Sequence, residues 1–290
     1  MTYKLQAANV LSLEERKKTI EIYNTRLIDL GIKKNDIIMS WDGNTINVII
    51  SNPGRYGEIK EQITDVLTAE GNLSFWETYA KDETYPFLDK AFGTKKQLKQ
   101  FTDLFDPESF PPRSFDSLVF VDKSCLVGYV YEKNMSRVNE ILDSLQNLKK
   151  FPENLKFAWS AKPNKDHPDA YELISLKSSK DGKAILDKPL LTEVSAIINK
   201  YNSVTEISMR MDSATAIKWA GITKVNIGKI LAIVLDGTVF SYPFVNSEIT
   251  GGVSNISGVF DKTEADHIVS LLKTVPLPSP MKMIGENDGK

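Results

Sequence analysis

Cysteine and histidine are almost absent from this sequence. Cys125 is the single cysteine, so no disulfide can form within the chain, and its apolar surroundings predict a buried structural thiol. The two histidines, His167 and His267, lie far from each other and far from Cys125 along the chain. No metal-ligand spacing or cysteine–histidine motif is visible, so we predict no metal site and no cofactor.

Long apolar runs and strongly charged segments are also lacking. The 36 basic and 38 acidic residues are well mixed and give a net charge of −2, which argues against a nucleic-acid surface or a basic membrane-binding patch. A membrane-spanning helix needs about 20 apolar residues, whereas the longest runs are as short as Ile230–Leu235, and the N-terminus has no signal-peptide core. These absences fit a cytoplasmic protein, and equally a segment whose membrane helices lie outside it.

What the sequence does contain is a regular series of helix and strand patterns. The N-terminal part predicts the order α-β-β-α-β, which favours a ferredoxin-like half with helices on one face of an antiparallel sheet. The signals are a capping box at Ser12 and Glu15, a helical face formed by Ile20, Tyr23, Leu27 and Leu30, strands over Asp36–Trp41 and Thr45–Ile50 around Asp42-Gly43-Asn44, a helix with Ile59, Ile63, Val66 and Leu67 on one face, and a strand over Leu73–Thr78.

The middle of the chain begins irregularly, over residues 81–115, with a short helix expected between Lys95 and Phe105. A β-β-α-β-β module is then predicted, with strands over Ser117–Val121, Leu126–Tyr131, Leu155–Ser160 and Tyr171–Leu176 and a helix over Ser136–Leu148. The polar residues 178–182 are the best boundary in the second half of the chain. The overall class predicted is α+β.

The C-terminal part repeats this alternation of strands and helices. The expected elements are a strand over Val204–Arg210, a helix from Asp212 to about Val225, strands over Ile230–Leu235 and Val239–Val245, and a helix that begins with a capping box at Asp261 and Glu264.

Motifs that could carry catalysis have simpler structural explanations. Asp236-Gly237 separates two apolar runs and predicts a hairpin turn, with no second carboxylate or histidine at ligand spacing. Gly251-Gly252 lacks the Lys-Ser/Thr that follows in a phosphate-binding loop, so a tight loop is predicted. No serine lies in a nucleophile-elbow context. We therefore predict no catalytic residues and no enzyme activity, and a hydrolase would need a triad that the sequence does not display.

Three aromatic residues alternate along one expected strand: Phe240, Tyr242 and Phe244. The two-residue period places them on one face, and Pro243 favours a sheet edge or a strand end. This face is either part of the core or a partly exposed surface that contacts unfolded polypeptide, for which main-chain hydrogen bonds at an open edge would supply affinity independent of sequence. The sequence leaves both interpretations open.

The C-terminal motifs resemble the head of the first periplasmic (P1) domain of the SecD family in order and spacing. They are residues 228–237 (GKILAIVLDG), Ser241-Tyr242-Pro243, residues 249–252 (ITGG), residues 256–260 (ISGVF), Glu264-Ala265 and residues 277–280 (LPSP). Residues 24–32 (NTRLIDLGI) resemble the family's helix that ends Arg-x-x-x-Leu-Gly, and the strand before Asn52-Pro53-Gly54 resembles its base. Val275 and His267 depart from the family pattern, and residues 81–155 match it poorly.

The resemblance implies a division of the chain into three parts. These are a base domain at residues 1–82 to which residues 281–290 return, a middle module at 83–180 that is a lineage-specific elaboration, and a head domain at 181–280. Hinges between base and head are expected near Ala80–Thr84 and Pro276–Pro280.

The implied function is that of an extracytoplasmic domain of a SecD or SecDF protein in the plasma (inner) membrane. Such a domain binds emerging unfolded preprotein and assists export driven by the proton motive force, with SecF and the SecYEG channel as partners and the membrane helices outside this sequence. The alternative is a periplasmic module of an efflux-type transporter that binds small apolar molecules.

Candidate site residues follow from the aromatic strand and the matched motifs. The expected preprotein-binding residues are Phe240, Tyr242, Phe244, Ile249, Ile256 and Phe260. The residues expected to form turns or other structural motifs are Asp236, Gly237, Gly251, Gly252, Gly258, Pro278 and Pro280.

Overall fold

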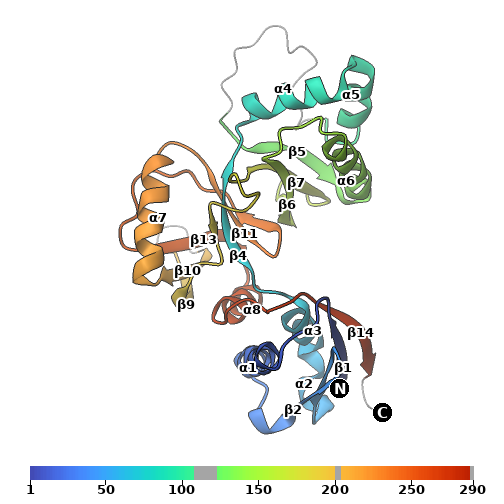
Figure 1. The fold of residues 1–290 in the computed structure, drawn as a ribbon, viewed down its shortest axis with the longest axis vertical. Coiled ribbons are helices and arrows are strands. Elements are labelled where there is room, and N and C mark those ends of the chain that lie inside the picture. Colours follow the sequence, from blue (N-terminus) through green and yellow to red (C-terminus); the bar gives the residue numbers. More distant parts are fainter. Residues whose placement is uncertain (108–122, 200–203, 288–290) are drawn as a thin grey trace. The chain divides into compact units, whose positions relative to one another are not determined.

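The computed structural model describes residues 1–107, 123–199 and 204–287 (Figure 1). The chain divides into two compact units, and each is built from separate stretches of sequence. The first unit comprises Met1–Leu73, Lys188–Ala216 and Gly252–Lys290, and the second comprises Ser74–Asp187 and Ile217–Gly251.

The first unit contains a four-stranded antiparallel sheet with the strand order β14-β1-β3-β2. Its elements are β1 (Thr2–Ala7), α1 (Leu13–Asp29), a 3-10 turn (Lys34–Asp36), β2 (Ile37–Asp42), β3 (Thr45–Ile50), α2 (Pro53–Tyr56), a 3-10 turn (Gly57–Ile59), α3 (Lys60–Thr68) and β14 (Met281–Asn287). Alternate residues of β1 and β3, such as Tyr3, Leu5, Ile46 and Val48, are fully buried. This is the pattern of a sheet with one face in a core.

Two predictions for this region are confirmed and one is wrong. Ser12 accepts the amide of Glu15 and the Glu15 carboxylate accepts the Ser12 amide, which is the expected capping box of α1. The hairpin around Gly43 is also present. The strand Leu73–Thr78 (β4), however, does not complete this sheet and lies in the sheet of the second unit. The N-terminal strand β1, which no pattern had indicated, and the C-terminal strand β14 complete it instead.

The first unit also contains a three-stranded sheet with the order β13-β10-β9. Its strands are β9 (Leu191–Ile198), β10 (Thr205–Met211) and β13 (Val253–Phe260). Helix α8 (Lys262–Leu272) contacts all three strands and also α1 and α3, so it joins this sheet to the helices of the first sheet. Ile268, Leu271 and Leu272 are buried, whereas Val275, which follows the helix, is 40% exposed.

The second unit contains a seven-stranded sheet with the order β5-β7-β6-β12-β11-β4-β8. Its strands are β4, β5 (Leu126–Tyr131), β6 (Leu155–Pro163), β7 (Ala170–Lys177), β8 (Leu186–Asp187), β11 (Leu231–Leu235) and β12 (Thr238–Ser241), and its helices are α4 (Lys81–Phe92), α5 (Lys95–Thr102), α6 (Glu132–Asn147) and most of α7 (Ser213–Val225). All five residues of β11 are buried, so both faces of this central strand are covered.

Most elements expected in the second unit are confirmed, with differences at their ends. The strand expected over Ser117–Val121 falls outside the described residues. Ala80–Thr84, expected to be an irregular hinge, is instead the N-cap and first turn of α4, where the Glu83 carboxylate accepts the Ala80 amide. The α+β class is confirmed by the alternation of sheets and helices in both units.

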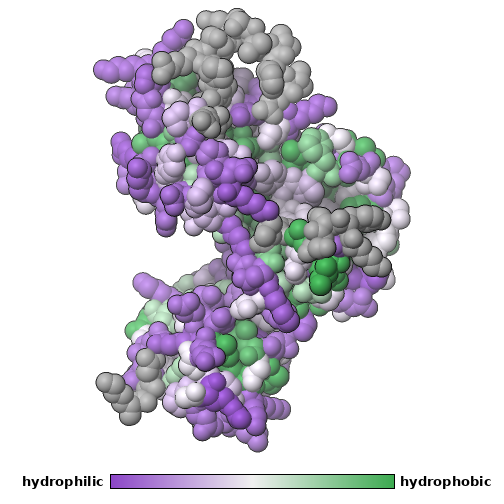
Figure 2. All heavy atoms as spheres, turned by 180° about the vertical axis from the view of Figure 1, so that it is seen from behind, coloured by the Kyte–Doolittle hydropathy of each residue, from purple (hydrophilic) through white to green (hydrophobic). Residues whose placement is uncertain are grey.

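The surface mixes hydrophilic and apolar residues. On the face drawn in Figure 2, hydrophilic residues cover much of the area and apolar residues form separate patches. Within the described residues, no helix has both the length and the apolar character needed to cross a bilayer.

Candidate functional site

The aromatic residues lie at the end of β12, in the second unit. Strand β12 pairs with β11 on one side and, at Val239, with β6 on the other, so of the two positions expected for Pro243, a sheet edge or a strand end, the structure shows the strand end. The regular strand ends at Ser241, two residues before Pro243, which has no amide hydrogen to continue the ladder. The aromatic segment, defined here as residues 240–244, therefore begins inside the sheet and runs out of it.

Side-chain exposure separates the two faces of this segment. Val239, Ser241 and Val245 are buried, whereas Phe240 and Tyr242 are half-buried and Phe244 is 49% exposed. Phe240 and Tyr242 lie on either side of the buried Ser241, whereas Pro243, between Tyr242 and Phe244, is itself exposed because the regular strand has already ended. This distribution favours a partly exposed aromatic face over a core face.

Backbone hydrogen bonds hold the aromatic segment in place after the strand ends. The Gly228 amide donates to the Val245 carbonyl (2.8 Å), the Val245 amide donates to the Lys229 carbonyl (2.9 Å), and the Leu231 amide donates to the Pro243 carbonyl (3.2 Å). Gly228 has a φ of +78°, which a glycine adopts without strain at the end of α7. The exposed aromatic residues are therefore carried on a fixed backbone.

A carboxylate on strand β7, which lies beyond β6 in the same sheet, anchors Tyr242. The Tyr242 hydroxyl donates to Glu172 Oε2 (2.8 Å), and the Asn164 side-chain amide donates to Glu172 Oε1 (2.7 Å). Burial, and secondly the negative charge of Glu172, raise the pKa of Tyr242. Tyr242 therefore stays protonated throughout the physiological pH range, and its hydroxyl donates a hydrogen bond to Glu172.

A second polar cluster in the same unit could not be found from the sequence. Tyr131 donates to Asp106 Oδ2 (2.5 Å), His167 Nδ1 lies 3.4 Å from the same oxygen, and the ring of His167 stacks on Tyr129 with 4.8 Å between centroids. Asp106 is 4% exposed, so these contacts satisfy a buried carboxylate. Tyr129 and Tyr131 lie on β5, whereas Asp106 and His167 come from separate loops far apart in the sequence, and the cluster includes no serine or cysteine nucleophile.

The other expected binding residues do not join the aromatic segment. Ile249 is half-buried in the second unit, where its amide donates to Thr223 Oγ1 (2.9 Å). Ile256 and Phe260 belong to β13 in the first unit and are buried, at 0% and 7% exposure. Only Phe240, Tyr242 and Phe244 remain as candidates for a binding surface.

Among the residues expected to form turns or other structural motifs, Asp236, Gly237, Gly251 and Gly252 lie in turns or loops, whereas Gly258 lies in a strand. Asp236 and Gly237 both have positive φ, at +50° and +80°, between β11 and β12. Gly252 has a φ of +63°, and a Cβ on it would lie 2.5 Å from Ala216 Cβ, whereas Gly251 has open space around it. Gly258 lies within β13. Between Pro278 and Pro280, the buried Ser279 hydroxyl accepts the Asn9 amide (3.1 Å).

The part of the chain that the structure describes contains no candidate metal site, and its single thiol is buried. No group of three or more His, Cys, Asp or Glu side chains there could hold a metal ion. Cys125 is fully buried, which confirms the prediction of a buried thiol.

Comparison with known proteins finds a family match for the C-terminal part of the chain. Residues 168–279 match the family model of the SecDF P1 head subdomain. Residues 168–279 are thus similar to a SecDF P1 head subdomain, and SecD proteins are among the relatives that the chain matches. Among its SecD relatives, the protein translocase subunit SecD of Rhodothermus marinus is 31% identical over 169 residues, which cover 57% of this chain and 26% of that protein. SecD of Rickettsia bellii is 39% identical over 104 residues, or 36% of this chain and 20% of that protein.

A solved structure of SecDF supports the fold over the whole chain. This chain is similar to a solved structure described as a membrane component SecDF that enhances protein export. The TM-score is 0.56, the sequence identity is 19%, and the match covers 99% of both chains. At that identity the likeness concerns the fold alone. Because the chain spans only about a quarter or less of the SecD relatives named above, it corresponds to one part of a SecD protein.

The structure gives a physical role to the arginine of the Arg-x-x-x-Leu-Gly motif of SecD. Arg26 is fully buried and its guanidinium donates to the carbonyls of Val66 (3.0 Å), Ala69 (2.6 Å) and Glu70 (2.9 Å). These carbonyls lie at and after the C-terminus of α3, where the helix leaves them without partners of its own. A Cβ at Gly71 would lie 2.5 Å from Arg26 Nη2, so glycine is required there.

Proposed function

We propose that this chain is the extracytoplasmic domain of a Sec translocase accessory subunit and that it binds emerging preprotein. The observation that supports this best is the aromatic segment, where Phe240, Tyr242 and Phe244 present partly exposed rings on a fixed backbone. Aromatic rings gain contact area at low entropic cost and accept many side chains, which suits a client without fixed sequence.

The partners and the energy source follow from the family. SecD relatives are named as protein translocase subunits, and the similar SecDF is described as enhancing protein export. We infer that the full protein acts with SecF and the SecYEG channel and uses the proton motive force through a membrane part outside this sequence. Since the match is to SecD over many motifs, an efflux-type module that binds small apolar molecules is the weaker alternative.

A ferredoxin-like base also belongs to this proposal. The strand order β14-β1-β3-β2, with α1 between β1 and β2 and α3 after β3, supports that description of the first sheet. The division into a base at residues 1–82, a middle module at 83–180 and a head at 181–280 stays a prediction, as does a hinge near Pro276–Pro280.

The test is site-specific photocrosslinking in a full-length SecD that carries this chain, with a preprotein stalled in the channel. Probes at Phe240, Tyr242 and Phe244 are expected to give adducts that require the stalled client. A probe at Ile28, which is 42% exposed on α1, is the matched control and is expected to give none.

Adducts from Ile28 that equal those from the aromatic segment would mean unspecific contact. If the aromatic segment gives no adducts while probes in residues 123–176 do, the client surface lies in the middle module and the proposed site is wrong.

A further inference from the structure

Strand β9 forms one edge of the three-stranded sheet β13-β10-β9 in the first unit (Figure 1). It pairs with β10 on one side, and within the described residues no strand pairs with its other side. An open edge presents a row of backbone amides and carbonyls, so the occupant that complements it is another extended chain. We refer to the open side of residues 191–198 as the β9 edge.

The register of β9 on β10 shows which backbone groups point outward. The Asn199 amide donates to the Val204 carbonyl (2.8 Å), and the two strands keep this register along most of their length. In an antiparallel ladder, residues that bond to the partner strand alternate with residues whose amide and carbonyl point away from it. Val194, Ala196 and Ile198 therefore direct their backbone groups to the β9 edge, where the residues that the structure describes provide no hydrogen-bond partner for them.

The sequence of β9 lacks the residues that most often block an edge strand. It has no proline and no lysine, and its single charged residue, Glu193, pairs with Arg210 of the neighbouring strand (2.9 Å). Six of its eight residues are exposed, among them Ile197 (37%) and Ile198 (71%), so both faces of the strand reach solvent. On the edge strand β2, by contrast, half-buried and exposed residues alternate. A strand added to the β9 edge would cover apolar surface that β9 leaves open to solvent.

A small pocket adjoins the start of the β9 edge. It has a volume of about 70 Å³ and lies between the first residues of β9 and the end of α8, with Leu190, Leu191 and Val275 among its lining residues. Leu190 (56%) and Val275 (40%) are exposed, so the pocket is open to solvent. One water molecule needs only roughly 10–15 Å³ of such space, so the pocket admits an aliphatic side chain. In strand addition, main-chain hydrogen bonds supply affinity and pockets of this kind select side chains.

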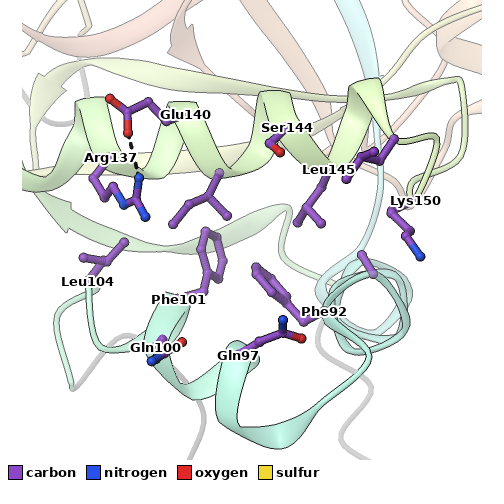
Figure 3. Close-up of a pocket in the computed structure, with 13 residues that line it drawn as sticks. Phe92, Gln97, Gln100, Phe101, Leu104, Arg137, Glu140, Ser144, Leu145 and Lys150 are labelled. Carbon is purple, nitrogen blue, oxygen red and sulfur yellow. Dashed lines mark hydrogen bonds and ion pairs between the residues drawn. The ribbon is translucent and has the colours of Figure 1, made fainter.

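The pocket between α5 and α6 in the second unit does not specify its occupant in the same way. It has a volume of about 760 Å³, and apolar, amide and charged side chains line it together (Figure 3). Phe101 belongs to the core, where its ring packs against Phe92 and Phe105. A mixed lining of this kind is compatible with several classes of ligand, whereas the β9 edge selects an extended backbone.

We propose that the β9 edge binds an extended segment of unfolded polypeptide by strand addition, with an aliphatic side chain of that segment in the pocket beside Leu190. Val194, Ala196 and Ile198 offer amides and carbonyls that a peptide of almost any sequence can pair with, because its own backbone carries the same groups. The proposal rests on the proposed function only in taking the natural peptide to be emerging preprotein. The β9 edge belongs to the first unit and the aromatic segment to the second, so the two sites can be tested separately.

The probe is a fluorescein-labelled synthetic peptide of about seven alternating valine and threonine residues, with the threonine amides N-methylated and a lysine tail for solubility. Such a strand has free amides along one edge only, so it can pair with the protein but cannot stack into fibrils with itself. Fluorescence polarisation with the whole chain is expected to show saturable binding. A peptide with every amide N-methylated is the matched control and is expected to bind about tenfold more weakly or less.

Substitutions on the β9 edge test the same contact from the side of the protein. Ala196→Pro removes an amide that points outward, leaves the ladder with β10 intact and obstructs an added strand, so binding is expected to weaken by about tenfold or more. Ile198→Lys places a charge at the edge and is expected to weaken binding several-fold. The matched control is Ile38→Lys, which alters a 55% exposed isoleucine on the edge strand β2 and is expected to leave binding unchanged. Circular dichroism verifies that each variant is folded.

The proposal is overturned by the absence of saturable binding, by equal binding of the two peptides, or by binding that the variants of β9 leave unchanged. If Ala196→Pro does not fold, Ile198→Lys and the fully methylated peptide decide the matter. A dimer of the whole chain that sedimentation detects and Ile198→Lys abolishes would also overturn it, because a second copy would then occupy the edge. Failure of crosslinking at the aromatic segment, with peptide binding at the β9 edge intact, would contradict the proposed site on that segment and not this one.

Discussion

Arg26 heads the largest fully buried side chains of the described residues, ahead of any aromatic ring. Burying a guanidinium is tolerated only when its donors are satisfied, and here three carbonyls and the Thr274 hydroxyl (3.1 Å from Nε) accept from it. This one residue links α1, the end of α3 and the segment after α8.

Replacing Arg26 is therefore expected to cost much of the stability of the first unit. Arg26→Met keeps the length of the side chain but leaves the carbonyls of Val66, Ala69 and Glu70 without this donor, and we expect a loss of about 3 kcal/mol in the free energy of unfolding. Urea unfolding followed by circular dichroism measures it. Arg55→Met, which alters an exposed arginine on α2, is the control and is expected to change stability by less than about 0.5 kcal/mol. Equal effects of the two variants would contradict the role of Arg26.

The burial of His267 on α8 leads to a prediction of how the free energy of unfolding depends on pH. Its Nδ1 atom is buried without a hydrogen-bond partner, and burial lowers the pKa of its imidazole, with Asp65 acting against this shift and Arg26 adding to it. Since the folded state binds the proton less readily than the unfolded state, the neutral form stabilises the fold above the unfolded pKa of about 6.5, and stability is lost as the pH falls through that value.

In the variant His267→Gln, the free energy of unfolding is expected to fall less as the pH is lowered. The measurement is the free energy of unfolding from about pH 7.5 to pH 5, a window that spans the unfolded pKa of histidine, for both proteins. Carboxylates contribute equally to the two curves, so their difference isolates His267. Parallel curves would show that His267 is not the group responsible.

At the scale of elements, helices and strands followed from local signals. Capping boxes at Ser12 and Asp261 and the apolar face of α3 were visible in sequence, and these helices begin and end close to the expected residues. Helix α4 and strand β9 were missed. Strand β9 is exposed along most of its length, so it shows no hydrophobic alternation that could reveal it.

The contact between the loop before β13 and helix α7 gives a matched pair of glycine variants. Gly252→Ala would place a methyl group 2.5 Å from Ala216 Cβ at a φ of +63°, so both the loop and the first turn of α7 must shift. We expect a loss of about 2 kcal/mol, seen as a lower Tm. Gly251→Ala, with open space around it, is expected to leave the Tm nearly unchanged. A neutral Gly252→Ala would mean that the loop relaxes freely.

At the scale of the whole molecule, sequence reasoning failed where distant strands pair. Strand β4 was placed in the wrong sheet because its own residues show only that it is a strand, and its neighbours β11 and β8 lie more than a hundred residues further along the chain. The aromatic segment was found from its period of two, but its exposure depends on which strands flank β12, and local sequence does not encode that.

Strands from distant parts of the chain lie next to each other in the seven-stranded sheet. We therefore predict that residues 168–279, which match the P1 head, cannot fold by themselves. Residues 168–279 contain β7, β11 and β12 but lack β4, β5 and β6, which pair with or flank them in the sheet. The isolated fragment would expose those edges and part of the hydrophobic core, so we expect a poorly dispersed amide spectrum by nuclear magnetic resonance. The whole chain, measured in parallel, is expected to give a dispersed one. A well-dispersed spectrum from the fragment would show that the head is autonomous.

The pairing of the first and last strands has a mechanical consequence. Thr2 pairs with Asn287 and Ala7 with Met281, so the two strands enter and leave the sheet at the same end. A force that draws the chain's two ends apart would load this antiparallel ladder one hydrogen-bonded pair at a time, beginning at Thr2 and Asn287. Because β1 is also paired with β3 while β14 is an edge strand, β14 would peel away first. Under tension across the two ends, the hydrogen bonds between β1 and β14 would therefore break in sequence, before the buried helices behind the sheet are disturbed.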